Sequence, residues 1–201
     1  MFYICNMRVR EEYSIVIRPP EKIISSVKDM KMFLYNNIGK FGSQNSEAHI
    51  SMVNFIADST ELNKVIIYLE AFCLSSSFKD ISFISLDSFP STLYLGASSD
   101  THEWFKALVK RFSKHFPLNK TTCKFKTTII PHITIGRDLD ALRITRACYL
   151  FENQKVDFAF QCNRVTIRKL NPTVGQYEAL SHHLFGNKTD LYLEDQQLSL
   201  F

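Results

Sequence analysis

Two short segments of the sequence place a histidine and a hydroxyl side chain two residues apart inside an apolar, β-branched run. They are the segments "AHISMVNF" and "IIPHITIGR", which carry His49 with Ser51 and His132 with Thr134. Side chains alternate across a β-strand, so each histidine and its hydroxyl face one side while the intervening apolar residues face the other. Each segment therefore predicts a strand that buries one face and presents an imidazole beside a hydroxyl on the other.

The surroundings of the two histidine segments are also alike. Around each one, hydrophobic periodicity predicts a helix, the histidine strand, a second helix and a further strand. Several strands follow one another without a helix between them, and their apolar alternation is typical of antiparallel sheets with one solvated face. We therefore expect an α+β, two-lobed fold made by duplication, in which two mainly antiparallel sheets face a central cleft and the helices lie outside.

Proline, glycine and helix-capping residues delimit the expected elements. In chain order we expect a strand at 13–18, a helix at 21–38 with Gly39 past its end, a strand at 48–55, a helix capped at 58–60, strands at 80–89 and 91–98, a helix capped at 100 or 101 and ended by Pro117, a strand at 121–135, a helix at 138–153, and strands at 155–170 and 173–185.

The chain of 201 residues is long enough for one domain, and no segment rich in Gly, Ser or Pro divides it. We predict a single domain over residues 1–201, with pseudo-repeats at roughly 13–90 and 91–185 and a tail at 186–201. The tail is amphipathic enough to dock on its own chain or on a neighbour. The sequence leaves that choice and the oligomeric state open.

Composition restricts the location and the partners. With 45% hydrophobic and 22% charged residues, the chain is expected to be globular. It has no apolar run near the ~20 residues of a membrane helix, and its start does not resemble a signal peptide. Its five cysteines are odd in number and lack C-x-x-C spacing, so we expect reduced thiols and a cytoplasmic location. The net charge of +4 leans weakly toward anionic partners.

The residue types of the paired segments indicate acid–base chemistry on a phosphate. A single His-x-Thr is more typical of a half-exposed histidine beside a β-former, and it is the recurrence that indicates function. Two imidazoles near their ordinary pKa of ~6.5 can divide proton transfer, one taking a proton and the other delivering one. Two hydroxyls and the guanidinium of Arg137 suit the oxygens of a tetrahedral anion. This set predicts in-line attack on a phosphodiester.

A zinc site is the main alternative use of paired histidines. Metal sites need three or more converging ligands, and the sequence has no HxH, HExxH or Cys cluster. His182 and His183 are adjacent, so only one of them can face the cleft from a strand. We therefore expect no metal and no other cofactor.

The two segments resemble the signature of the 2H phosphoesterase superfamily, whose best-known branch contains bacterial 2′,5′ RNA ligases and RNA 2′,3′-cyclic phosphodiesterases. That signature is a pair of H-hydrophobic-[S/T]-hydrophobic motifs, here "HISM" and "HITI". The resemblance extends over most of the chain, from the opening strand before Pro19-Pro20 to the closing "VTIRKL…GQYEAL" strands. It implies a two-lobed fold with a central cleft and metal-independent chemistry on RNA-type phosphodiesters, including 2′,3′-cyclic phosphate ends.

The resemblance also implies roles for individual residues. It gives His49 and His132 as the acid–base pair, and Ser51 and Thr134 as phosphate binders. Arg137 lies where members of the RNA ligase branch often carry an arginine that helps catalysis. In hydrolysis of a 2′,3′-cyclic phosphate, the family pattern makes His132 the base that activates water and His49 the acid that protonates the ribose oxygen. The roles reverse for ligation.

Three further residues are candidate contacts for a base or substrate. The RNA ligase branch usually has an aromatic residue five positions after the first histidine, where this chain has Asn54. By alternation Phe55 shares the face of His49, so it could stack on a base or belong to the core. Lys126 falls on the cleft side of the second histidine strand, and Tyr177 could reach the cleft from the closing strand. A solvated lysine and a packed strand tyrosine are the structural alternatives.

Two function classes follow from these residues. The first is a metal-independent phosphoesterase that acts on nucleotide or RNA phosphodiesters and opens 2′,3′-cyclic phosphates, with 2′,5′ RNA ligation as a related activity that uses the same residues. The second is a non-catalytic module that binds RNA or a nucleotide in the same cleft. Turnover of a cyclic-phosphate oligonucleotide in EDTA separates the two classes.

Overall fold

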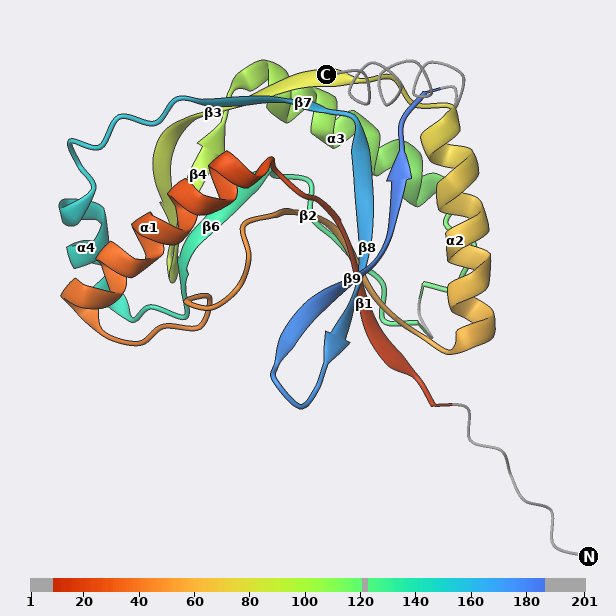
Figure 1. The fold of residues 1–201 in the computed structure, drawn as a ribbon, viewed down its shortest axis with the longest axis horizontal. Helices are drawn as coiled ribbons and strands as arrows, with labels where there is room; N and C mark the ends of the chain where they lie inside the picture. Colours follow the sequence, from red (N-terminus) through yellow and green to blue (C-terminus); the bar gives the residue numbers. More distant parts are fainter. Residues whose placement is uncertain (1–8, 121–122, 187–201) are drawn as a thin grey trace, which may run out of the picture.

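The computed structural model of the protein describes residues 9–120 and 123–186, and the predicted tail lies almost entirely outside them. The described chain forms four helices and a nine-stranded sheet (Figure 1). The helices are α1 (Glu21–Ile38), α2 (Ser59–Leu74), α3 (Ser99–Lys114) and α4 (Ala141–Leu150). The strands are β1 (Glu11–Ile17), β2 (Ile50–Ala57), β3 (Lys79–Phe89), β4 (Thr92–Ala97), β5 (Lys126–Thr127), β6 (His132–Arg137), β7 (Phe158–Cys162), β8 (Arg164–Asn171) and β9 (Gln176–Leu184).

Local sequence signals explain where the helices begin. The Asp58 side chain accepts a hydrogen bond from the backbone N–H of Glu61, and the Glu61 carboxylate accepts one from the backbone N–H of Asp58. This reciprocal pair is a capping box, and it starts α2 at the position that the sequence predicts. In α3 the cap is Ser98, slightly earlier than expected, because its hydroxyl reaches the N–H of Thr101.

The sheet corrects the expectation of two facing sheets. Its strands follow the order β7-β3-β4-β6-β2-β1-β8-β9, with β5 paired to β2, and the strand pairings within the described residues are antiparallel. The strands β7-β3-β4-β6 form one half of the sheet and the strands β2-β1-β8-β9 form the other half. The two halves are joined where β2 meets β6, through Ile50 and Ile133. These residues directly follow the two histidines, so the histidine strands are neighbours in one continuous sheet. The α+β class and the antiparallel pairing are confirmed.

The sheet is curled, as the path of the chain through its two edges demonstrates. β7 forms one edge of the sheet, whereas β8 lies beside β9 at the opposite edge. Only Asn163 separates β7 from β8 in the sequence, so the sheet must curve until its edges approach each other. The single strand expected at 155–170 is therefore two strands. Curvature gives the sheet a concave face, and the histidines lie in its middle strands.

The helices cover the sheet in two groups. α1 packs against α4 and β6, while α2 packs against β2 and β9, and α3 lies beside β3 (Figure 1). The two groups share one continuous apolar core. Within the described residues, no helix is both long and apolar enough to cross a membrane.

The second histidine strand is shorter than expected. Residues 121 and 122 of the strand expected at 121–135 lie outside the described residues, and over the rest of that range the chain forms the two-residue β5 and then the separate strand β6, which begins at His132 itself. Pro131 directly precedes β6, and a proline lacks the N–H that a strand ladder needs. The strand that carries the second motif therefore starts at its histidine.

Candidate active site

A β-bulge three residues after each histidine determines which side chains enter the concave face. In β1–β2 the register moves from Val16 opposite Ser51 to Ile15 opposite Val53, which leaves Met52 as the extra residue. Such a bulge reverses the alternation that follows it. Asn54, five residues after His49, consequently faces the same side as the histidine and Phe55 faces away.

The same irregularity occurs in β6. There Tyr94 of β4 lies opposite Thr134 and Leu93 lies opposite Gly136, so Ile135 is the extra residue. Arg137 is thereby brought onto the face of His132. Strict alternation would turn Arg137 away, and the bulge beside Gly136 supplies the change of side.

Both imidazoles are held by the same kind of hydrogen bond. The Nδ1 of His49 lies 2.7 Å from the carbonyl oxygen of Glu47, and the Nδ1 of His132 lies 2.9 Å from that of Ile130. A carbonyl only accepts, so each Nδ1 carries the proton and donates it. The Nε2 atom of each neutral ring is then left as the basic nitrogen that is available for proton transfer.

A cavity of about 800 Å³ occupies the concave face at the join between the two halves. All eight site residues predicted from the sequence border it: His49, Ser51, Phe55, Lys126, His132, Thr134, Arg137 and Tyr177. The Ser51 and Thr134 hydroxyls have no hydrogen-bond partner among the described side chains and backbone, and both residues are half-buried. The cavity therefore combines two imidazoles, two uncommitted hydroxyls and a guanidinium.

The sequence left open whether the Phe55 side chain contacts a base or packs in the core, and the structure places it in the core. Its side chain is 1% exposed, stacks on Tyr13 with ring centroids 5.4 Å apart, and meets Phe116 edge-on at 5.7 Å. The ring thus belongs to the core and only borders the cavity. The physical reason is the bulge at Met52, which gives the cavity face to Asn54 instead.

The other two candidate contacts lie at the rim of the cavity. Lys126 is exposed on β5, where it pairs with Asn54 of β2. Tyr177 is half-buried, its hydroxyl donates to the Glu12 carboxylate, and its ring lies 5.2 Å from the guanidinium carbon of Arg168. Burial, together with the hydrogen bond to Glu12, raises the pKa of Tyr177, so it remains a neutral phenol.

Arg168 and the aromatic wall around His132 are parts of the site that the sequence reasoning missed. Phe89 and Tyr94 stack on each other at 4.4 Å, and both meet the His132 ring edge-on, at 5.5 and 5.3 Å. Arg168 is 7% exposed and borders the same cavity. The sequence did contain a signal for Arg168. Arg164, Thr166 and Arg168 alternate along β8, which places polar side chains on one face of an otherwise apolar strand.

Burial keeps both imidazoles neutral. It lowers the pKa of His49 to about 3, with the positive charge of Arg168 acting in the same direction. Burial also lowers the pKa of His132. Cations and desolvation both disfavour the imidazolium form, so an anion placed between the rings would raise both pKa values. Anion binding in this cavity should therefore be accompanied by proton uptake.

This pKa shift predicts a pH dependence of stability. Between pH ~6.5 and ~3 the His49 imidazole is protonated in the unfolded chain and neutral in the folded one, so stability falls as the pH falls. One such group contributes a slope of at most about 1.4 kcal/mol per pH unit. We expect His49→Asn to reduce the loss of unfolding free energy between pH 7 and pH 5 in urea titrations.

His115→Asn, at an exposed histidine beyond α3, is the matched control and should leave that loss unchanged. An equal loss of unfolding free energy in wild type and His49→Asn would show that the His49 imidazole is not desolvated in the folded protein.

The chain matches a known protein family in sequence and known structures in fold. A profile described as "2'-5' RNA ligase superfamily" matches residues 19–172, which include both histidine strands and Arg168. The chain belongs to this superfamily, that of the 2H phosphoesterases. A search of curated protein sequences finds no match.

Solved structures related to the superfamily share the fold at low sequence identity. LigT of E. coli complexed with 3′-AMP is 10% identical, with a TM-score of 0.61 over 89% of this chain and 100% of LigT. Its complex with NADP⁺ gives a TM-score of 0.63 over 88% and 98%. TT0787 of Thermus thermophilus is 13% identical, with a TM-score of 0.57 over 88% of this chain and 99% of its own. The LigT-like fold is therefore nearly complete in this chain.

The histidine and cysteine residues of the described chain do not gather into a metal centre. No group of three or more His, Cys, Asp or Glu side chains converges anywhere in residues 9–120 and 123–186. His182 faces Thr166 and His183 contacts Ser181, so the adjacent pair points two ways. Metal-independent chemistry stays a prediction for this member of the superfamily.

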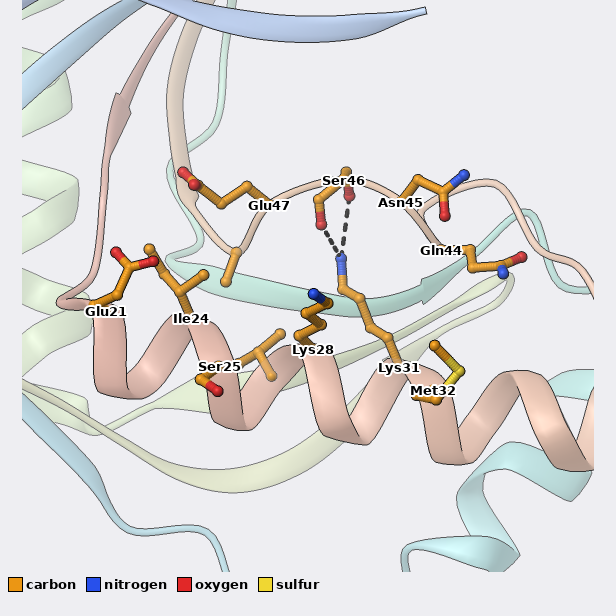
Figure 2. A pocket seen from close by; sticks show the side chains of 12 residues that line it. Glu21, Ile24, Ser25, Lys28, Lys31, Met32, Gln44, Asn45, Ser46 and Glu47 are labelled. Atoms are coloured by element: carbon orange, nitrogen blue, oxygen red, sulfur yellow. Dashed lines mark hydrogen bonds between the residues drawn. The ribbon is translucent and has the colours of Figure 1, made fainter. Parts of the chain in front are cut away.

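A buried lysine fastens the loop that leads into the first histidine. Lys31 of α1 is 3% exposed, and its ammonium donates to the carbonyl of Ser43 at 2.9 Å and to the carbonyl and hydroxyl of Ser46 at 2.7 and 3.1 Å. Figure 2 shows this lysine extending from the helix to the loop beside the exposed Lys28. Burial lowers the pKa of Lys31 to about 8.

The same loop is tied to the second histidine strand. The hydroxyl of Ser43 donates to the carbonyl of Ile135 at 3.1 Å, and the N–H of Gly42 donates to the carbonyl of Arg137 at 3.0 Å. The loop also carries Glu47, whose carbonyl orients His49. Lys31 therefore helps to fix the position of one histidine relative to the strand of the other.

We expect Lys31→Met to lower stability by about 1.5–3 kcal/mol, since it leaves one buried carbonyl and one partly buried carbonyl without a charged donor. The rate constant kcat should also fall, because the loop that orients His49 is released. Urea denaturation and steady-state kinetics measure the two effects. Lys28→Met, one turn earlier and exposed, should change neither quantity. Equal effects of the two substitutions would contradict the anchoring role.

Proposed function

We propose that this protein is a phosphoesterase that opens 2′,3′-cyclic phosphates on nucleotide or RNA ends, with His49 and His132 as the acid–base pair. The observation that carries the proposal is the shared cavity, which both imidazoles border together with two uncommitted hydroxyls. The nucleotides bound by LigT in its solved complexes add support for a nucleotide-type substrate. Ligation in 2′,5′ linkage would open the same cyclic phosphate with the 5′-hydroxyl of a second strand in place of water.

The reaction needs one proton acceptor and one proton donor on opposite sides of the phosphorus. A water molecule gives a proton to one Nε2 as its oxygen forms a bond to phosphorus. The other imidazole enters this step as an imidazolium, because it takes up a proton when the anionic substrate binds. The bond from phosphorus to one ribose oxygen then breaks, and that oxygen receives the proton from Nε2 of this imidazolium. The product is a ribose monophosphate, and exchange with solvent returns each imidazole to its starting state. Ser51, Thr134 and Arg137 would donate to the non-bridging oxygens.

The electrostatics of this chain indicate which histidine acts as the base and which acts as the acid. The pKa of His49 is lowered by burial and also by the nearby cations Arg168 and Lys31, so His49 is suited to begin as the neutral base. His132 lies against aromatic rings, and burial is what lowers its pKa, so it is suited to carry the proton. This is the opposite of the assignment that the family resemblance implies.

The proposal is tested with the full chain, EDTA and an oligoadenylate that ends in a 2′,3′-cyclic phosphate. We expect steady conversion to a single monophosphate isomer, since only one ribose oxygen can face the acid. Full conversion in EDTA would be consistent with catalysis by the imidazole pair. No conversion, with an intact folded protein, would contradict the proposal.

A non-catalytic binding module is the second candidate. It would show tight, salt-sensitive binding of RNA without turnover in the same experiment. The two uncommitted hydroxyls and the two matching Nδ1 hydrogen bonds favour the enzyme, because binding alone does not require both imidazoles to be held through Nδ1 with Nε2 left for proton transfer.

A further inference from the structure

A second cavity adjoins the first on the concave face. It has a volume of about 360 Å³ and shares Arg168 and Tyr177 with the larger cavity. The remaining residues that matter for its chemistry come from the end of β1, the loop before β2, and strands β8 and β9: Arg18, Glu47, Arg164, Thr166 and His182.

The charge of this second cavity is positive. It contains three guanidinium groups and one carboxylate. That carboxylate, Glu47, already forms an ion pair with Arg18, whose Nε and Nη2 donate to its two oxygens at 2.8 and 2.9 Å. Across the described residues, no salt bridge involves Arg164 or Arg168. Two guanidinium groups therefore lie at the wall of one cavity without a carboxylate in direct contact, although the charge of Glu47 acts on Arg168 from a greater distance.

Of the two guanidinium groups without a salt bridge, that of Arg168 indicates a binding site for an anion most clearly, because its side chain is buried. Its Nη2 donates to the hydroxyl of Ser14 at 3.1 Å, and its Nε has no hydrogen-bond partner in the described chain. A buried charge is costly unless it is paired, and its cation–π contact with Tyr177 replaces only part of the lost hydration. Arg168 borders both cavities, so an anion in either one would contact the same cation.

Strand register fixes how far apart the two cavities are. Val16 of β1 lies opposite Ser51 on one side and Thr166 on the other, and Thr166 lies opposite His182. Neighbouring strands are about 4.8 Å apart, so Thr166 is two strand spacings, on the order of 10 Å, from Ser51. The Thr166 hydroxyl lies 2.9 Å from Nδ1 of His182, which fixes both side chains in the second cavity.

We propose that the second cavity binds a neighbouring phosphate of an oligonucleotide whose terminal phosphate occupies the first cavity. The inference rests on the proposed function, and it specifies the substrate as an oligonucleotide rather than a single nucleotide. Arg164 and Arg168 neutralise the internal phosphate, and Arg168 lies between the two phosphates. The second cavity thereby distinguishes a chain end from a free cyclic mononucleotide.

The test compares adenosine 2′,3′-cyclic phosphate, which has one phosphate, with a triadenylate that ends in a 2′,3′-cyclic phosphate and has two internal phosphates. Arg164→Gln removes the exposed guanidinium of the second cavity without touching the first. Arg146→Gln, an exposed arginine on α4, is the matched control. We expect Arg164→Gln to raise KM for the triadenylate about tenfold and to leave KM for the mononucleotide within about twofold. Arg146→Gln should change neither KM.

The outcomes separate this inference from the proposed function. If wild type opens both substrates and Arg164→Gln changes both KM values alike, or neither, the second cavity does not bind an internal phosphate and the proposed function stands. If wild type opens neither substrate, the proposed function fails, and calorimetric binding of a triadenylate 3′-phosphate decides the inference. An affinity about tenfold weaker in Arg164→Gln than in Arg146→Gln then supports it, and equal affinities overturn it.

Discussion

His49→Ala and His132→Ala should each lower kcat for a cyclic-phosphate oligonucleotide by about 10²–10⁴-fold, because each removes one of the two proton-transfer groups. The double variant should lose little more than the worse single variant, since the two groups act in one step. Steady-state kinetics in EDTA measure these losses, and circular dichroism establishes that the variants are folded. His115→Ala, outside the cavity, should retain full turnover.

A substrate with a good leaving group assigns the two roles. In a nucleoside 3′-(4-nitrophenyl phosphate) the ribose 2′-hydroxyl attacks phosphorus and nitrophenolate leaves, which is ring opening run in reverse, so the histidine that activates water in ring opening becomes the acid here. The nitrophenolate leaves without a proton, so a variant that lacks only this acid regains activity. The electrostatics make His49 the base of ring opening and therefore the acid in this reaction, so they predict that His49→Ala is rescued and His132→Ala is not. Rescue of His132→Ala alone would restore the division of roles implied by the family resemblance. Unchanged turnover of the cyclic phosphate in either variant would remove that histidine from the mechanism.

Phe55→Ala should lower the free energy of unfolding by about 3–5 kcal/mol, because it opens a hole beneath the histidine strand where the ring contacts Tyr13 and Phe116. Phe55→Leu keeps most of the apolar volume and should cost less than about 1.5 kcal/mol. Urea denaturation measures both losses. Because the ring packs in the core, KM for the oligonucleotide should be the same in Phe55→Leu as in wild type.

Phe89 differs from Phe55 in its position, since the Phe89 side chain is half-buried and borders the cavity beside His132. A raised KM in Phe55→Leu, with stability close to wild type in Phe55→Ala, would place the Phe55 ring against the substrate rather than in the core.

The motif residues could be predicted from sequence because a strand has a period of two. That period brings His49 with Ser51 and His132 with Thr134 to one face, and all four border the cavity. It cannot reveal the bulge in each strand, since Met52 and Ile135 are ordinary apolar strand residues. For this reason strict alternation wrongly placed Phe55 on the face of His49. In the second strand, Gly136 indicated that the strand could change direction before Arg137.

Long-range pairing was the other part that periodicity could not supply. The two halves form a single sheet because Ile50 pairs with Ile133, and nothing local in either strand specifies that partner. The break at Asn163, which sends β7 to one edge of the sheet and β8 to the position beside the opposite edge strand β9, is likewise set by the curl of the sheet. Arg168 was missed because its importance comes from burial beside Tyr177, not from a motif.

The most direct test of the proposed active site is a crystal structure of the wild-type protein with inorganic phosphate. We expect one phosphate in the larger cavity, with oxygens within hydrogen-bonding distance of Nε2 of both His49 and His132, and contacts to the Ser51 and Thr134 hydroxyls. A phosphate bound by only one of the two imidazoles, or a cavity in which the two Nε2 atoms face away from each other, would contradict this expectation.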